Sequence, residues 1–185
     1  MASPKPSVLR GLVVGATAGL AATVVMGQFQ KLSSLGQKAV EKQHKLADGE
    51  SPWQIAHEQA EEEQKQATQE NSTEIVARKI AAVAGAQIPP GSRKQAGQVV
   101  DYGFGTLMGM VYGVAAELAP EVSSGGGTAF GTLLFLGADE IAVPALSLSP
   151  PPTETAPTDH LQHWAAHIVY GGTLELVRVL LRRLV

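Results

Sequence analysis

Four stretches of the chain contain few charged residues, and a long polar stretch separates the first from the other three. The apolar stretches are residues 11–27, 103–119, 125–146 and 164–177. A helix needs ~20 mostly apolar residues to cross the hydrocarbon core of a bilayer, with a range of about 17–25. The pattern therefore predicts an all-α polytopic membrane bundle of four transmembrane helices with a helical extramembrane insert.

Glycines recur at every fourth position in three of these stretches. In a soluble helix each glycine costs up to ~1 kcal/mol relative to alanine. In a bilayer, small residues let two helices approach closely, and this packing replaces the missing hydrophobic drive. The repeated glycine ridge indicates helix–helix contact, either within the chain or between subunits. The glycines predicted to pack helices are Gly11, Gly15, Gly19, Gly105, Gly109, Gly113, Gly127 and Gly131.

Residues 1–31 hold the N-terminus and the first predicted transmembrane helix. Lys5 and Arg10 precede its apolar core, which is also the arrangement of a secretory signal. We favour a transmembrane span, because no small-x-small cleavage site precedes the polar region. The later apolar stretches also need a first span to pair with.

Residues 32–100 are predicted to form a polar, mostly helical, extracytoplasmic insert, followed by three further transmembrane helices in residues 101–185. Ser51, with Pro52 after it and Gln54 three residues on, predicts a helix start with a capping box. Asn71 offers a second cap. The next long helix is expected to begin near Ser92 and to end at Leu118, because Ala119-Pro120 stops it.

Basic residues flank the first and last apolar stretches, and Lys and Arg near span ends favour the cytoplasmic side. They are Lys5 and Arg10 at one end, and Arg178, Arg182 and Arg183 at the other. Both termini are therefore expected in the cytoplasm, which requires an even number of spans.

Ionisable residues within a span cost ~2.5–3.5 kcal/mol each and point to function. Asp139 and Glu140 lie in the third apolar stretch, and three histidines spaced by three and four residues share one face of the last helix. The depths of the two sets match, so they are expected to meet near the outer surface. The predicted polar network is Asp101, Tyr102, Asp139, Glu140, His160, His163 and His167.

Three interpretations of this network stay open at this point. It is a structural network that pins the third helix to the fourth, a metal site, or a proton or ion path. Asp139, Glu140, His163 and His167 are weak metal candidates, because His and carboxylate suit zinc or iron but no spacing here is diagnostic. A path would have to continue to Glu117 or Glu175, and Arg178 one turn later accounts for Glu175 as an ion pair.

The composition excludes several classes of function. The chain has no cysteine, which removes disulfides, thiolate metal sites and thiol nucleophiles. Its formal net charge is −3, without the concentrated basic face that nucleic acid requires. No nucleophile elbow or phosphate loop is present, so no catalytic residue is assigned and no cofactor is identified.

The stretches AFGTLLFLGADEIAVPALSLSPPP and DHLQHWAAHIVYG resemble the C-terminal half of the YagU-like family of uncharacterised bacterial inner-membrane proteins. The front stretches GLVVGATAGLAATVVMGQFQ and YGFGTLMGMVYG are similar too. Related sequences often carry His at the positions of Asp139 and Asp101, which weakens a metal site here. The resemblance implies a bacterial multi-span membrane protein and implies no activity.

Together these observations lead us to expect a non-enzymatic membrane protein, structural or an accessory subunit. The alternative is a proton, ion or metal-handling transporter that uses the outer polar network. The expected partners are the lipid bilayer and other membrane-protein subunits or further copies of the chain, and not nucleic acid. The expected location is the bacterial inner membrane.

Overall fold

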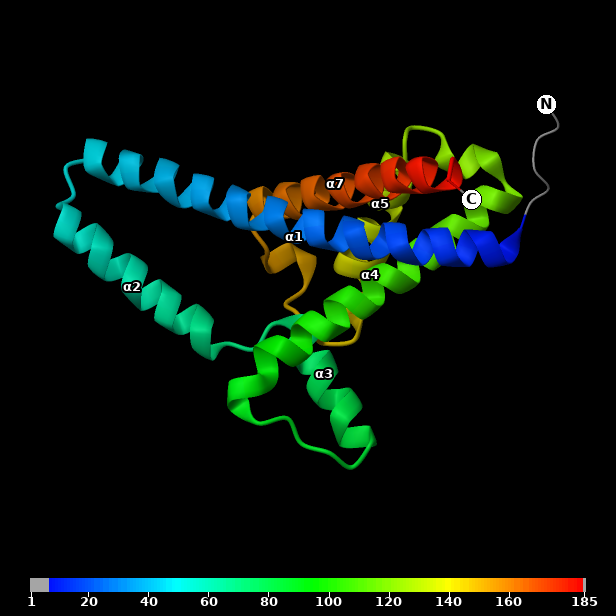
Figure 1. Cartoon of the computed structure of the whole chain (residues 1–185). Helices are drawn as coiled ribbons and strands as arrows, with labels where there is room; N and C mark the ends of the chain where they lie inside the picture. The colour runs from blue at the N-terminus through cyan, green and yellow to red at the C-terminus, as the bar shows by residue number, and fades with distance from the viewer. Residues whose placement is uncertain (1–6, 185) are drawn as a thin grey trace.

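A computed structural model describes residues 7–184, and this part of the chain is helical and contains no strand. The predicted all-α helical bundle is therefore confirmed. Its longest element is α1 (Val8–Ala47), which runs across the whole molecule in Figure 1. The beginning of α1 lies at the same side as the ends of α4 (Arg93–Leu118) and α7 (Pro157–Arg182). Lys5, one of the basic residues used to predict orientation, lies outside the described residues.

α1 is a single unbroken helix that continues far beyond the apolar stretch. Its 40 residues correspond to ~60 Å, about twice the ~30 Å hydrocarbon core. Ser7 caps its start by accepting a hydrogen bond from the Arg10 backbone N–H at 3.3 Å. The proposed domain boundary between residues 31 and 32 falls inside this helix, because nothing between Gln30 and Ala47 interrupts helical hydrogen bonding. The polar insert thus begins as the continuation of the first helix.

α2 (Pro52–Thr68) folds back along the second half of α1, and we call residues 30–68 the arm. The predicted capping box is present, with Ser51 and Gln54 bonding each other's backbone. Ion pairs at 2.8 and 2.9 Å join Lys38 to Glu63 and Lys45 to Glu58. Exposed pairs of this kind contribute only about 0–1 kcal/mol each. The arm is therefore a charged hairpin held by a few ion pairs and by the fully buried side chain of Ile55.

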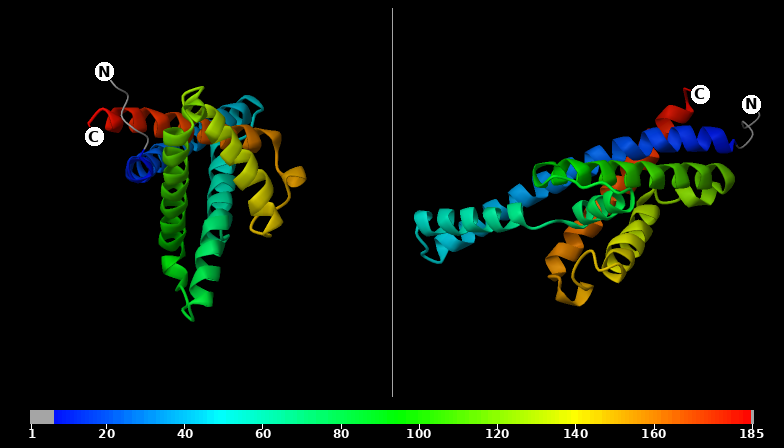
Figure 2. Two further views of the ribbon diagram at one scale, coloured as in Figure 1. Left: turned by 90° about the vertical axis from the view of Figure 1, so that its right-hand side faces the viewer. Right: turned by 90° about the horizontal axis from the view of Figure 1, so that it is seen from below.

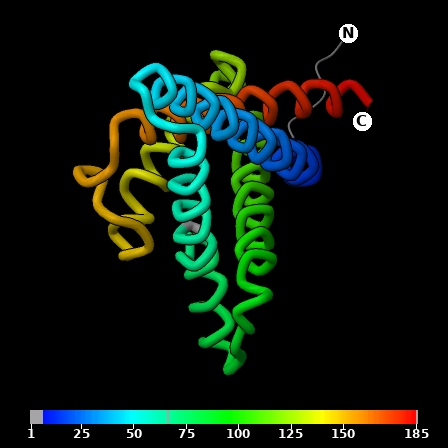
Figure 3. Tube along the Cα trace, turned by 90° about the vertical axis from the view of Figure 1, so that its left-hand side faces the viewer, coloured from blue at the N-terminus to red at the C-terminus, as the bar shows by residue number. Residues whose placement is uncertain are grey.

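α3 (Ser72–Val83) connects the arm to α4. Asn71 caps it by accepting a hydrogen bond from the Glu74 N–H at 2.9 Å, as the sequence predicted. Figure 3 shows α2 leading directly into α3, and the chain then turning back into α4. A short 3₁₀ turn at Pro90–Ser92 begins that return. α3 packs on the first turns of α4 where Gly97 lies against Glu74.

α1 and α4 pack antiparallel along their glycine ridges. A Cβ added to Gly11 would lie 2.8 Å from the carbonyl oxygen of Gly113, so the two backbones touch and leave no room for a side chain. The same close approach recurs twice further along the helices. The facing pairs are Gly11 with Gly113, Gly15 with Gly109, and Gly19 with Gly105. The glycine ridges of α1 and α4 therefore pack against each other within one chain.

The third apolar stretch is one helical rod with a change of winding. α5 (Thr128–Leu134) passes into a π-helical segment, η3 (Phe135–Ala142), and then into the short α6 (Val143–Ala145). Pro144 lacks the N–H that would bond the carbonyl of residue 140 in an α-helix, and the wider winding occurs immediately before it. α5 packs on α7, with Gly127 and Gly131 against its backbone.

The core is small, and the large apolar side chains point outward. Tyr112, Tyr170 and Leu174 are fully buried beside alanines of α1. In contrast, Leu9 is 72% exposed and Leu133 is 68% exposed. Soluble proteins rarely expose so many contiguous apolar side chains, whereas lipid is a suitable solvent for them. This distribution indicates a membrane protein.

By length and composition, three helices among the described residues could cross a membrane: Val8–Ala47, Pro90–Leu118 and Thr128–Ala145. α7 does not meet that measure, because histidines and arginines lower its mean hydropathy. It nevertheless lies against α1 and α5 within the bundle. In the right-hand view of Figure 2, the arm leaves the bundle on one side, and α5 and the first half of α7 diverge on the other.

Candidate functional site

Asp139 and Glu140 meet the histidines of α7, as their positions along the helices suggested. The carboxylate of Glu140 lies 2.7 Å from Nδ1 of His160. The carboxylate of Asp139 lies 3.7 Å from Nδ1 of His163 and 3.8 Å from Nδ1 of His167. Glu140 therefore makes a close hydrogen bond, whereas Asp139 has two histidine neighbours without a short contact.

The helix geometry of α7 determines what the histidines can bind. His167 Nδ1 lies 2.9 Å from the carbonyl oxygen of His163, one turn earlier, and it must donate a proton to that carbonyl. In the neutral ring, Nε2 is then an acceptor, and it makes no hydrogen bond within residues 7–184. His167 is only 6% exposed. The Nε2 atom is therefore available as an acceptor to a ligand that reaches it.

A cavity of about 520 Å³ lies between α1, α4, η3 and α7. It brings together five of the seven predicted network residues: Asp101, Tyr102, Asp139, His163 and His167. Glu140 and His160 are not among its lining residues, and they form a separate pair that reaches the loop through the Pro152 carbonyl. The predicted network is thus divided into a cavity-lining set and a structural pair.

The cavity is also lined by residues that the sequence analysis did not identify. α1 contributes Thr23 and Lys31, and α7 contributes Tyr170 at the buried end. The Tyr170 hydroxyl donates a hydrogen bond of 2.6 Å to the carbonyl of Gly105. Lys31 could have been found as the first basic residue beyond the first apolar stretch. The Tyr170 contact depends on tertiary packing, and no local signal predicts it.

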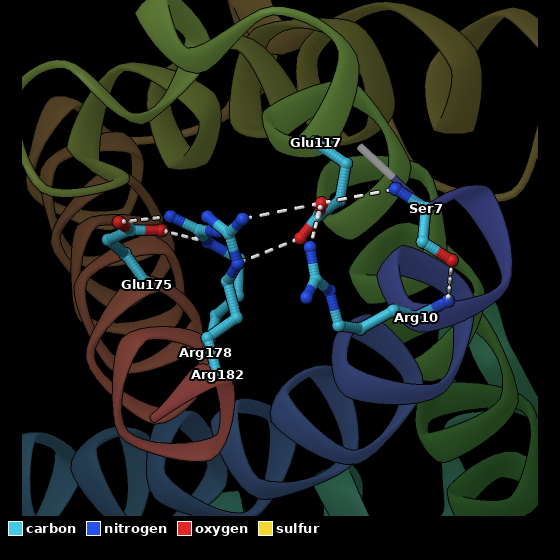
Figure 4. A network of polar contacts seen from close by, with 6 residues as sticks. All are labelled: Ser7, Arg10, Glu117, Glu175, Arg178 and Arg182. Atoms are coloured by element: carbon cyan, nitrogen blue, oxygen red, sulfur yellow. Dashed lines mark hydrogen bonds and ion pairs between the residues drawn. The ribbon is translucent and has the colours of Figure 1, made fainter. Parts of the chain in front are cut away.

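At the opposite end of the bundle, Glu117 is a buried carboxylate shared by three helices (Figure 4). It is 5% exposed and lies 3.0 Å from Arg10 of α1 and 2.9 Å from Arg182 of α7. The Ser7 backbone N–H also points at it, at 3.4 Å. A buried charge needs such partners, because removing it from water is costly. The sequence identified Glu117 as a candidate without finding its arginine partners.

Glu175 forms the second ionic contact at this end. Its carboxylate binds Arg178 through two hydrogen bonds of 2.6 and 2.8 Å, and it accepts a third from the Tyr112 hydroxyl at 2.9 Å. The expected ion pair with Arg178 is therefore present, with a tyrosine from α4 added. Glu117 and Glu175 are fully engaged in ionic contacts, in contrast to Asp139.

The four metal candidates do not form one metal centre. No group of three or more His, Asp or Glu side chains within residues 7–184 is placed to hold a metal ion. Asp139, His163 and His167 face the cavity, while Glu140 is occupied by His160. The arrangement instead combines acceptors, an apolar wall and aromatic rings around one space.

Most of the residues that line the cavity lie in a region that matches a protein family. Residues 89–176 match DUF1440, a family described as a protein of unknown function. The match covers slightly less than half of the chain and agrees with the resemblance to the YagU-like family. It includes α4, α5, η3 and most of α7, but neither α1 nor the arm. No curated protein and no solved structure matches the chain at a significant level.

Proposed function

We propose that this protein is a non-enzymatic subunit of the bacterial inner membrane, structural or accessory, that binds other membrane proteins. It spans the membrane four times, with both termini in the cytoplasm. The arginines at the shared end of α1 and α7, Arg10, Arg178 and Arg182, support this orientation under the positive-inside rule. The arm then lies outside the cytoplasm.

The arm is the observation that carries the accessory role. It extends a charged hairpin away from the bundle (Figures 1 and 3), and some of its apolar side chains are exposed. Leu35 and Trp53 are 63% and 73% exposed. The glycine ridges of α1 and α4 do not bind a partner, because they already pack against each other within the chain. A partner would therefore be bound by the arm.

Site-specific photo-crosslinking in cells tests this role. A photoreactive residue at Leu35 or at Trp53 should give a discrete adduct with a membrane protein, and the adduct should co-purify in mild detergent. Val83 on α3 is also highly exposed and provides the matched control position. A lone monomer without an adduct at either arm position would contradict the proposal.

The outer cavity favours a second candidate, the handling of protons or ions. Asp139, His163 and His167 line it, and Asp139 lacks a short ionic partner. Intramembrane ionisable residues of this kind often mark transport paths. Flux into proteoliposomes should fall in Asp139→Asn and stay unchanged in Glu140→Gln, whose side chain does not line the cavity. Equal flux in wild type and Asp139→Asn would reject this candidate.

A further inference from the structure

The outer cavity has the size and wall of a small-molecule site. Its volume of about 520 Å³ lies within the range of about 300–1,000 Å³ that is usual for ligand pockets. Most of its wall is apolar, because α1, α4 and the third helical rod turn aliphatic and aromatic side chains toward it. These are Val24, Met26, Phe104, Leu134, Ala142 and Val143. A ligand that fills it must be apolar over most of its surface.

The charges that line the cavity favour a cation. Asp101 and Asp139 contribute two carboxylates, and Lys31 contributes one ammonium group. Asp101 accepts a hydrogen bond from the Thr73 hydroxyl at 3.5 Å, and Asp139 has only the histidines at 3.7 and 3.8 Å. Both carboxylates therefore keep acceptor capacity for a further donor.

His167 indicates that this donor carries an N–H or O–H group. It is a nearly buried side chain that lines the cavity, and its Nε2 has no hydrogen-bond partner within the described chain. A ligand that supplies an N–H or O–H donor therefore gains a hydrogen bond at this nitrogen. Tyr102 and Phe104 add aromatic faces, which attract ammonium groups.

We propose that the outer cavity binds an amphipathic amine in its protonated, monovalent form. The ammonium group binds Asp139 and donates to His167, with Asp101 strengthening the negative potential, and the apolar body packs along Phe104 and Leu134. A metal ion fits less well, because no three His, Asp or Glu groups of the described residues are placed to hold one. The inference rests on the site of the second proposed function but requires binding only, so it does not depend on flux.

The test uses rigid probes of one shape, bound to the full chain in nanodiscs of phosphatidylglycerol and followed by calorimetry. 1-Adamantylammonium should bind saturably, and 1-adamantanecarboxylate, which has the opposite charge, should not. Asp139→Asn should weaken binding of the amine about tenfold, since it removes a charge-assisted hydrogen bond. Glu140→Gln, one residue away and outside the cavity, should stay within about twofold of wild type. Equal affinity of both probes, or of wild type and Asp139→Asn, would overturn the proposal.

Three further measurements keep the test decisive. If Asp139→Asn unfolds, as judged by circular dichroism, Asp101→Asn decides the matter, because Asp101 makes no ion pair with α7. The trimethylated probe lacks N–H donors and should bind several-fold more weakly, and equal binding would remove His167 from the site.

Phosphatidylethanolamine in the nanodisc should compete if the natural ligand is a lipid amine, and should not compete if it is a free solute. Flux without binding would reject this inference alone, and binding without flux would reject only the transport function.

Discussion

The carboxylate of Glu117 lies 3.0 Å from the guanidinium of Arg10, although the two residues are 107 positions apart in the sequence. This contact ties the first turn of α1 to the last turn of α4, and Arg182 extends it to α7. Three helices are thereby joined at the end of the bundle that we place in the cytoplasm. At the other end, the outer cavity separates the same helices. The bundle is therefore closed at one end and open at the other.

Replacing Glu117 with Gln should destabilise the bundle by about 3 kcal/mol, because breaking a buried ion pair leaves charge without compensation. The free energy of unfolding can be measured by titration with a denaturing detergent. Glu121→Gln is the matched control, since this exposed carboxylate follows α4 and makes no ion pair within the described residues. An equal effect of the two substitutions would contradict the role assigned to Glu117.

Replacing Gly109 with Ala should also destabilise the protein, by about 1–3 kcal/mol, because overpacking forces the backbones apart. An added Cβ there would meet the backbone of Gly15 and Gly19. Gly27 lies on α1 with nothing within 4 Å of an added Cβ, so Gly27→Ala should be neutral or slightly stabilising. Unfolding in detergent separates these outcomes, and equal stability of both variants would refute the ridge contact.

Local chemistry predicted the elements better than their partners. Ser51 and Asn71 cap helices where the sequence indicated, because capping depends on residues three positions away. The pairing of Gly11 with Gly113 depends on tertiary register, which a repeating ridge does not specify. The same holds for the joining of Glu117 to Arg10. The polarity change near residue 31 did not end α1, because a helix continues through polar residues that form helices well.

The sequence predicted only part of the outer site, because the site depends on tertiary packing as well as on local signals. Matching depths brought Asp139 and the α7 histidines together, since helical rise converts sequence distance into height. The division between Asp139 and Glu140 was not predicted. It depends on the wider winding of η3 and on which face of that rod meets α1 and α4. A periodic pattern of 3.6 residues does not describe a π-helical segment.

The arm should loosen at acidic pH. The neighbouring Lys38 ammonium lowers the pKa of Glu63 below its usual value, so Glu63 binds a proton less readily in the folded arm than in the unfolded chain. The pairing is therefore fully present above the unfolded pKa and is lost as pH falls through the lower, folded pKa. Spin labels at Gln43 and Gln59 should give a narrow distance distribution at pH 7 that broadens below about pH 4.

Lys38→Gln provides the control for this pH effect. It removes the ion pair at every pH, so its distance distribution should already be broad at pH 7 and should change less on acidification. The second link, Lys45 with Glu58, is present in both proteins, so their comparison isolates the contribution of the Lys38–Glu63 pair. A wild-type distribution that is unchanged down to pH 3 would mean that Glu63 does not hold α2 against α1.

The proposed topology can be tested cleanly because the chain has no cysteine of its own. Glu62→Cys on the arm should react with a membrane-impermeant maleimide in intact spheroplasts, because the arm lies outside the cytoplasm in a four-span protein. Arg183→Cys, at the end of α7, should react only after permeabilisation. With only the three spans found by hydropathy, α7 would not cross, and both cysteines would react from the same side. The labelling pattern therefore decides whether α7, with its histidines and arginines, is the fourth span.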